Sequence, residues 1–187
     1  APIIFIPSGI YRLTGQIKIP SNRRVFGEGD RSILKKSDQM IDRLIINSDK
    51  INGNIKIIME SFVIDGNRSA GIYVPLKDGL CFSGCSETII RNVTVRDCLN
   101  NGIIIEYGSS NQVSQCILAG NAKNGVYSSG SKSITIDDND CHGNLVGGVA
   151  VAATLNGMVA HNRCRGNRFD VLLGRDSRFI NVTENEC

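Results

Sequence analysis

An Asn-x-Cys pattern returns at a fixed distance in the last third of the chain. It occurs at Asn139–Cys141, Asn162–Cys164 and Asn185–Cys187, twice at a step of 23 residues. The residues around the pattern vary, so the constant step reflects the path of the backbone. A self-similar period of about 20–50 residues is typical of solenoids and propellers.

Within each repeat, apolar residues alternate with polar ones, as in Ile134/Ile136 and Val149/Val151. A period of 2 is the strand signature, and here it is broken by Asn and Gly at fixed offsets. No stretch of ten or more residues shows a helical period, so helices are not expected beyond a short turn. A leucine-rich repeat would need a different leucine pattern, and a propeller blade would need about 40 residues.

A coil of 23 residues with three short strands and three turns fits one rung of a parallel β-helix. Such a rung cannot bury its own apolar face, but rungs stacked about 4.8 Å apart build a continuous core. We therefore predict an all-β, single-stranded parallel β-helix (a solenoid) with about 23 residues per rung.

The repeat also sets the expected domain organisation. A chain of 187 residues is long enough for one domain and too short to suggest two. We expect residues 1–187 to form a single β-helix domain, with irregular rungs over 1–60 and regular rungs over 61–187. The chain opens in a strand-like run and stops inside a repeat, so we expect a fragment of a longer protein. In the irregular part, strands are predicted at 3–6, 10–13, 16–19 and 24–26.

Two stretches of the sequence resemble a known superfamily: "IPSGIY…IKIPSNRRVFGEG…ILK" in the first 35 residues and "FVIDGNR" at 62–68. Both are similar to pectate-lyase-like proteins, whose fold is a right-handed parallel β-helix. Polysaccharide lyases, polygalacturonase-type hydrolases, mannuronan epimerases and phage tailspike depolymerases share this fold. The resemblance implies a right-handed helix, but one scaffold hosts many chemistries.

The aligned repeats give predicted columns of stacked residues. Taking a shorter middle turn after Arg91, the inward corner column reads Asn67, Cys98, Cys116, Asn139, Asn162, Asn185. The next inward column holds Leu118 above Cys141, Cys164 and Cys187. Parallel side chains on adjacent rungs keep Cβ atoms further apart than a disulfide prefers, so we expect a ladder of free thiols. Disulfides and a metal site remain the less favoured alternatives.

An outward column offers a candidate acid–base constellation. It places His161 between Asp138 and Glu184 on neighbouring rungs, and the carboxylates should raise the pKa of the imidazole. The alternative, which we favour, is that opposite charges stacked on a solvated face relieve repulsion.

The longest insertion in the repeat region, residues 65–79, is the other candidate site, because long loops on a regular scaffold often carry function. The resemblance implies a sugar-binding groove beside it on the third strand of each rung. Catalytic candidates are Asp78, Glu106 and Lys77. Candidates for substrate binding are Arg68, Tyr73, Tyr107 and Tyr127. An ordinary surface loop with salt bridges is the alternative.

The family's sharper motifs are not matched. In the epimerases a Tyr-Gly-Phe-Asp-Pro-His type motif enters this strand, where Asn101, Ile104 and Glu106 stand here for its Tyr, Asp and His. No cluster of three outward acids suggests Ca²⁺, so no cofactor or metal is expected. A net charge of +3 with dispersed basic residues suggests neither nucleic acid nor an anionic membrane, and no apolar run is long enough to span a bilayer.

Two functions follow from the sequence. The first is a carbohydrate-active protein that binds an extended polysaccharide, with a uronate-containing one as the candidate, and cleaves or modifies it as a lyase or hydrolase. The second is a non-catalytic structural or glycan-binding shaft, such as part of a phage tailspike or surface appendage, with a homotrimer as the candidate assembly. Either function implies an extracellular, cell-surface or virion location.

Overall fold

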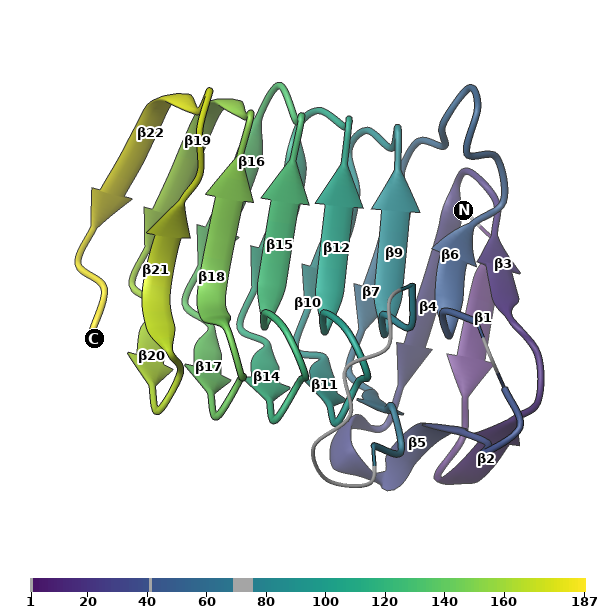
Figure 1. Cartoon of the computed structure of the whole chain (residues 1–187). Coiled ribbons are helices and arrows are strands. Elements are labelled where there is room, and N and C mark those ends of the chain that lie inside the picture. Colours follow the sequence, from purple (N-terminus) through teal and green to yellow (C-terminus); the bar gives the residue numbers. More distant parts are fainter. Residues whose placement is uncertain (1, 41, 69–75) are drawn as a thin grey trace.

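The computed structural model describes residues 2–40, 42–68 and 76–187. The chain winds through three parallel β-sheets in turn, and each new rung stacks beside the previous one (Figure 1). The described residues contain no α-helix, and one short 3-10 turn lies at Gly29–Arg31. The predicted all-β parallel solenoid is confirmed.

Each sheet consists of strands from successive rungs. Sheet A contains β1 (Ile3–Ile6), β4 (Arg23–Gly27), β7 (Ile57–Glu60), β10 (Ile89–Arg91), β13 (Asn111–Ser114), β16 (Ile134–Asp137), β19 (Leu155–Ala160) and β22 (Arg178–Thr183). Sheet B contains β2 (Gly9–Leu13), β5 (Ser32–Lys36), β8 (Val63–Asp65), β11 (Thr94–Arg96), β14 (Ile117–Ala119), β17 (Asp140–His142) and β20 (Arg163–Arg165). Sheet C contains β3 (Ile17–Ile19), β6 (Ile45–Asn47), β9 (Leu80–Ser83), β12 (Ile103–Glu106), β15 (Val126–Ser129), β18 (Gly147–Ala152) and β21 (Phe169–Leu173).

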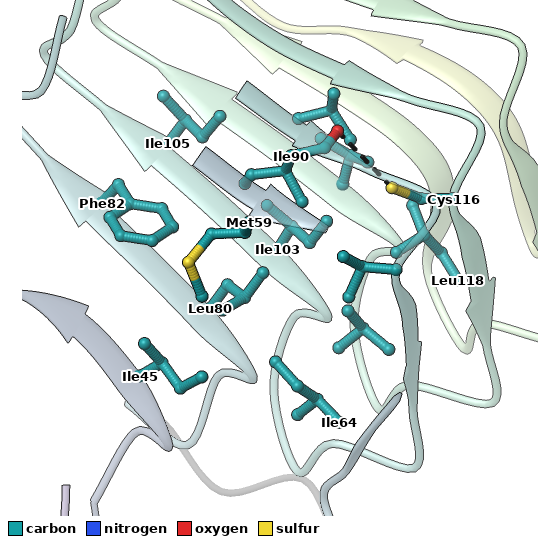
Figure 2. Close-up of a cluster of buried hydrophobic side chains, with 14 of the residues drawn as sticks. Ile45, Met59, Ile64, Leu80, Phe82, Ile90, Ile103, Ile105, Cys116 and Leu118 are labelled. Carbon is teal, nitrogen blue, oxygen red and sulfur yellow. Dashed lines mark hydrogen bonds between the residues drawn. The ribbon is translucent and has the colours of Figure 1, made fainter. Parts of the chain in front are cut away.

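The core is built from inward columns of branched side chains. In sheet A one column runs through Met59, Ile90, Val113, Ile136 and Val159, all fully buried. Figure 2 shows this core between sheets A, B and C, where large side chains from the three sheets pack together. Burying each such side chain contributes about 1.5–3 kcal/mol, so successive rungs stabilise one another.

Two of the three corners of a rung pair a left-handed residue with an inward asparagine. Between sheets A and B, His161 has a φ of 53°, and the next residue, Asn162, points inward. Between sheets B and C, Gly143 has a φ of 63° and precedes the buried Asn144. Glycine adopts this conformation freely, and Asn, Asp and His adopt it more often than other residues. The backbone turns there, so that the next side chain points into the core.

The asparagines form two continuous ladders. Asn139, Asn162 and Asn185 form the first, and the backbone N–H and Nδ2 of Asn162 both donate to Oδ1 of Asn185 at 2.9 and 3.0 Å. Asn121, Asn144 and Asn167 form the second with the same pattern. Each amide also donates to a backbone carbonyl, so these buried polar groups are paired.

The predicted register around Cys98 is wrong. The backbone N–H of Cys98 donates to Asn121 Oδ1, and that of Cys116 donates to Asn139 Oδ1, each across 23 residues. The two cysteines therefore head different ladders at different corners, and no shortened middle turn exists between them. The 23-residue step extends back to the pair of Asp78 and Asn101.

All seven cysteines are free thiols, in agreement with the predicted ladder. Leu118, Cys141 and Cys164 are neighbours in register on the inner side of sheet B, and all three are buried. The prediction is wrong for Cys187, the next member of the predicted column, which is exposed.

The first rungs have the expected strands but unequal lengths. The predicted strands at 3–6, 10–13, 16–19 and 24–26 correspond to β1, β2, β3 and β4. The step from β2 to β5 is 23 residues, while the step from β6 to β9 is 35 residues because the longest insertion lies between them.

Candidate functional site

Asp78, a predicted catalytic residue, is a buried structural carboxylate. Its side chain is fully buried, and Oδ2 pairs with Nε of Arg43 at 2.9 Å. Oδ1 accepts hydrogen bonds from the backbone N–H and Nδ2 of Asn101, at 3.1 and 3.0 Å. Both oxygens thus have partners, and the full burial of the side chain keeps the carboxylate away from a substrate on the surface.

Asp78 begins a third polar ladder, which runs in the opposite direction to the other two. The backbone N–H and Nδ2 of Asn124 donate to Oδ1 of Asn101, and Asn101 donates in turn to Asp78. The ladder ends at Asn124, whose buried Oδ1 has no hydrogen-bond partner among the described residues. The next rung has Gly147 there, and a Cβ on that glycine would lie 2.7 Å from Asn124 Oδ1.

Asp78 and Glu106 lie at opposite ends of the sheet C strands. Asp78 contacts Asn101 before the start of β12, whereas Glu106 is the last residue of β12. Arg43 lies within reach of the charges of both carboxylates. Paired glycosidase carboxylates both face the substrate, whereas the carboxylate of Asp78 is fully buried and bound by Arg43 and Asn101.

Glu106 and two predicted sugar platforms lie on the outer side of sheet C. Glu106 is half-buried, and Tyr107, which follows it, is 72% exposed with a φ of 55°. The Tyr107 ring lies over Gly130 of the next rung, where a Cβ would approach the ring to 2.6 Å. Tyr127 packs against the buried Ile104, and Lys123 Nζ lies 5.7 Å from the Tyr127 ring centroid.

Arg68 and Lys77, two further residues of the predicted loop site, lie near the corner between sheets B and C. The backbone N–H of Arg68 donates to Asp97 O at 3.0 Å, which ties Arg68 to the corner between sheets B and C. Lys77 lies near Lys36, whose pKa is lowered from its ordinary value by burial first and then by the charge of Lys77. Tyr73 lies outside the described residues.

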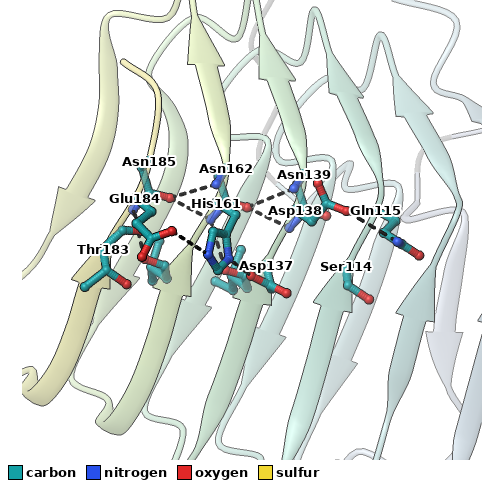
Figure 3. Close-up of polar contacts among 12 residues, drawn as sticks. Ser114, Gln115, Asp137, Asp138, Asn139, His161, Asn162, Thr183, Glu184 and Asn185 are labelled. Atoms are coloured by element: carbon teal, nitrogen blue, oxygen red, sulfur yellow. Dashed lines mark hydrogen bonds and ion pairs between the residues drawn. The ribbon is translucent and has the colours of Figure 1, made fainter.

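The outward histidine is held between two carboxylates, one of which differs from the prediction. Nδ1 of His161 contacts Asp137 Oδ1 at 2.8 Å, and Nε2 contacts Glu184 Oε2 at 3.0 Å (Figure 3). Asp138, the predicted partner, instead accepts a hydrogen bond from Gln115 at 3.3 Å. The hydrogen bond from His161 to Asp137 is the main cause that raises the pKa of His161. Desolvation opposes it, and the charges of Asp137 and Glu184 add to the increase. The arrangement favours the protonated, positively charged imidazole of His161 on a solvated face.

A groove on sheet A was not predicted. It has a volume of about 660 Å³ and is lined by Asn22, Lys56, Ile58, Glu87, Ile89, Ser110 and Gln112. The sites predicted from the sequence lie on the outward columns of sheet C and of the asparagine corner, whereas this groove follows the corner before sheet A. The sequence signal that marks it is a charged residue two positions before an outward isoleucine, at Lys56/Ile58 and at Glu87/Ile89.

The described residues contain no group of three or more His, Cys, Asp and Glu side chains placed to hold a metal ion. Within 2–40, 42–68 and 76–187 no helix has the length and apolarity to cross a membrane.

Comparison with known proteins relates the chain to phage proteins. It is 30% identical over 114 residues to the pre-neck appendage protein of Bacillus phage phi29, an alignment that covers 56% of this chain and 13% of that protein. It is 26% identical over 165 residues to the pre-neck appendage protein of Bacillus phage B103, covering 74% of this chain and 19% of the relative. The chain thus spans less than a fifth of the length of these relatives.

Solved structures share the fold at lower identity. The pre-mature bacteriophage phi29 gene product 12 superposes with a TM-score of 0.69 at 18% identity, covering 97% of this chain and 29% of that one. The periplasmic alginate epimerase AlgG superposes with a TM-score of 0.62 at 11% identity, covering 97% and 43%. Residues 78–187, more than half of the chain, match the profile of the family described as right-handed β-helix region, and the chain therefore belongs to the right-handed β-helix family.

Proposed function

We propose that this chain forms a rigid β-helical shaft in a virion appendage. The observation that carries the proposal is the unbroken stacking of rungs from Asp78 to Asn185, in which three ladders of buried side-chain hydrogen bonds lock each rung to the next. Paired buried polar networks rigidify a fold and specify one register. A stiff rod suits a part that holds other parts at a fixed distance.

The relatives supply the location. The similar proteins of phages phi29 and B103 are pre-neck appendage proteins, so a virion or extracellular location is expected here too. The proposal takes residues 1–187 as one β-helix domain and a homotrimer as the assembly.

The test is to label phage particles of the source with a gold-conjugated antibody raised against residues 1–187. Gold on a virion appendage is the expected result, and signal restricted to the soluble lysate would contradict the proposal. Light scattering coupled to gel filtration tests the trimer separately, and a monomer at all concentrations would remove that part.

A second candidate function is cleavage or modification of a bound polysaccharide. It rests on Glu106, which has an acidic side chain half-buried on the outer side of sheet C, directly beside the exposed Tyr107. Asp78 does not serve as its acid–base partner, because its oxygens are engaged by Arg43 and Asn101. Incubation with uronate-containing and neutral polysaccharides, read by ultraviolet absorbance for lyase products and by reducing ends for hydrolysis, tests this activity. A Glu106→Gln variant with unchanged product formation would exclude Glu106.

A further inference from the structure

The groove on sheet A is made of two adjacent columns that cross four rungs. One column consists of the corner residues that precede the sheet: Asn22, Lys56, Glu87 and Ser110, with φ between 55° and 57°. The other is the outward column two residues later, where Ile58, Ile89 and Gln112 are neighbours in register. Three rung intervals of about 4.8 Å give the groove a length of roughly 14 Å.

The groove combines an apolar floor with polar sides. Ile58 and Ile89 are half-buried and lie side by side on β7 and β10. At the side, Lys56 Nζ lies 4.0 Å from Glu87 Oε2, and both side chains remain more than half exposed. One ammonium and one carboxylate leave this part of the groove without net charge, while both still offer hydrogen bonds.

A second hollow continues the groove across the sheet. It has a volume of about 230 Å³ and shares Ile89 and Gln112 with the first. Its other lining side chains are polar: Arg91, Ser114, Gln115, Asp137 and Asp138. Arg91 is fixed there by its ion pair with the buried Glu60. The combined surface therefore offers both donors and acceptors along its length.

The groove lies on the face of sheet A, and this position limits the classes of ligand that can bind there. Backbone N–H and C=O groups of the central strands of sheet A are used between rungs, so a ligand on this face meets side chains only. An extended peptide gains its affinity by adding a strand at a free sheet edge, which this face does not provide. A ligand suited to the groove has apolar C–H surface for the isoleucines and many hydroxyl groups for the sides.

We propose that this groove binds an extended neutral glycan, with its sugar rings over Ile58 and Ile89 and its hydroxyl groups toward Lys56, Glu87 and Gln112. This site goes beyond the shaft function, because a shaft is complete without it. It also differs in place from the outer side of sheet C, where Glu106, Tyr107 and Tyr127 lie.

Titration of the 187-residue chain with cellohexaose, maltohexaose and chitohexaose, followed by ¹⁵N and methyl NMR, tests the proposal. We expect at least one hexasaccharide to shift the signals of Ile58, Ile89 and Gln112, and not those of Ile104 and Tyr107. In the variant Ile89→Arg, which fills the floor with a charged side chain, affinity should fall by about tenfold or more.

Met158→Arg is the matched control, because Met158 lies in the same outward column of sheet A, beyond the groove, and is 37% exposed. Its affinity should stay within about twofold of the parent chain. Lys56→Ala, at an exposed side chain, gives a second variant that removes one hydrogen-bonding group without touching the floor, and it should weaken binding by a smaller factor.

Four results would overturn the proposal: no binding of any of the three hexasaccharides, shifts centred on sheet C, equal effects of Ile89→Arg and Met158→Arg, or unchanged affinity in Lys56→Ala if Ile89→Arg does not fold. Labelling of virion appendages does not depend on any of these measurements, so the shaft and the glycan site can fail separately.

Discussion

Arg43 and Asp78 form an ion pair in which the side chain of Asp78 is fully buried and that of Arg43 is 16% exposed, with Nε 2.9 Å from Oδ2. The two residues are 35 positions apart in the sequence and come together because successive rungs stack. The pair lies at the end of the polar ladder that runs from Asn124 through Asn101 to Asp78. A buried charge without its partner is costly, whereas the pair as a whole contributes little compared with an apolar replacement.

We therefore expect Arg43→Met to lower the free energy of unfolding by about 3–5 kcal/mol, because it leaves Asp78 buried and unpaired. The double variant Arg43→Met/Asp78→Asn should recover much of this loss, since an amide Oδ1 still accepts from Asn101 without carrying a charge. Urea unfolding of the four proteins measures the coupling. Strictly additive single effects would contradict it.

The asparagine ladder gives a second prediction. Asn162 is fully buried, and its Oδ1 accepts from the backbone N–H and Nδ2 of Asn139, at 3.1 and 2.9 Å. Asn162→Ala leaves these buried donors unpaired and should cost about 3 kcal/mol in urea unfolding.

Asn185→Ala is the comparison, because Asn185 occupies the same column in the last described rung. It is half-buried, so water reaches the groups it leaves, and we expect a loss of about 1 kcal/mol. Equal losses at the two positions would show that burial of the ladder does not set its contribution.

The period, the strands and the inward asparagines were predictable from the sequence because each depends on local pattern. The register at Cys98 was not. "RDC" at 96–98 resembles "SQC" at 114–116, but one triplet lies at the corner after sheet B and the other at the corner after sheet A. Corners of one rung have similar composition, so only hydrogen bonds between rungs, such as Cys98 to Asn121, distinguish them.

The candidate site was harder to predict because it also depends on contacts between rungs. In the sequence, Asp78 is an acid in a long loop, and its burial depends on its ion pair with Arg43 of the preceding rung. His161 was correctly placed beside Glu184, but its second partner is Asp137 rather than Asp138, because the side chain of the left-handed corner residue leans back over sheet A. The sheet A groove depends on two columns meeting, which no single repeat reveals.

The thiols provide a third prediction. Six cysteines are buried and Cys187 is exposed. Burial raises the pKa of Cys81 and of Cys116 to about 12, so little thiolate forms at neutral pH. In the native protein, Ellman's reagent should react rapidly with Cys187 alone, and Cys187→Ser should abolish that rapid phase.

Denaturation without reductant should then expose all seven thiols. A smaller number in the denatured chain would mean that some cysteines form disulfides, and rapid reaction of several thiols in the native protein would mean that the core opens.

The contacts of His161 with Asp137 and Glu184 make the stability of the last rungs depend on pH. The pKa of His161 is raised above its ordinary 6.5, chiefly by the hydrogen bond to Asp137 and then by the charges of Asp137 and Glu184. Folding thus favours the protonated ring, so its stabilising contribution is complete below the unfolded pKa and is lost as the pH rises through the folded pKa. The stability difference between the parent chain and His161→Gln should therefore be largest below the ordinary pKa of 6.5 and should shrink as the pH rises through the raised pKa of the folded state. NMR titration of the His161 ring checks the cause directly.

In this titration, Asp137→Asn should lower the pKa of His161, whereas Asp138→Asn, which removes the carboxylate that is hydrogen-bonded to Gln115, should change it much less. A larger decrease in Asp138→Asn would mean that the pairing of His161 follows the adjacent corner column and not the sheet A residue.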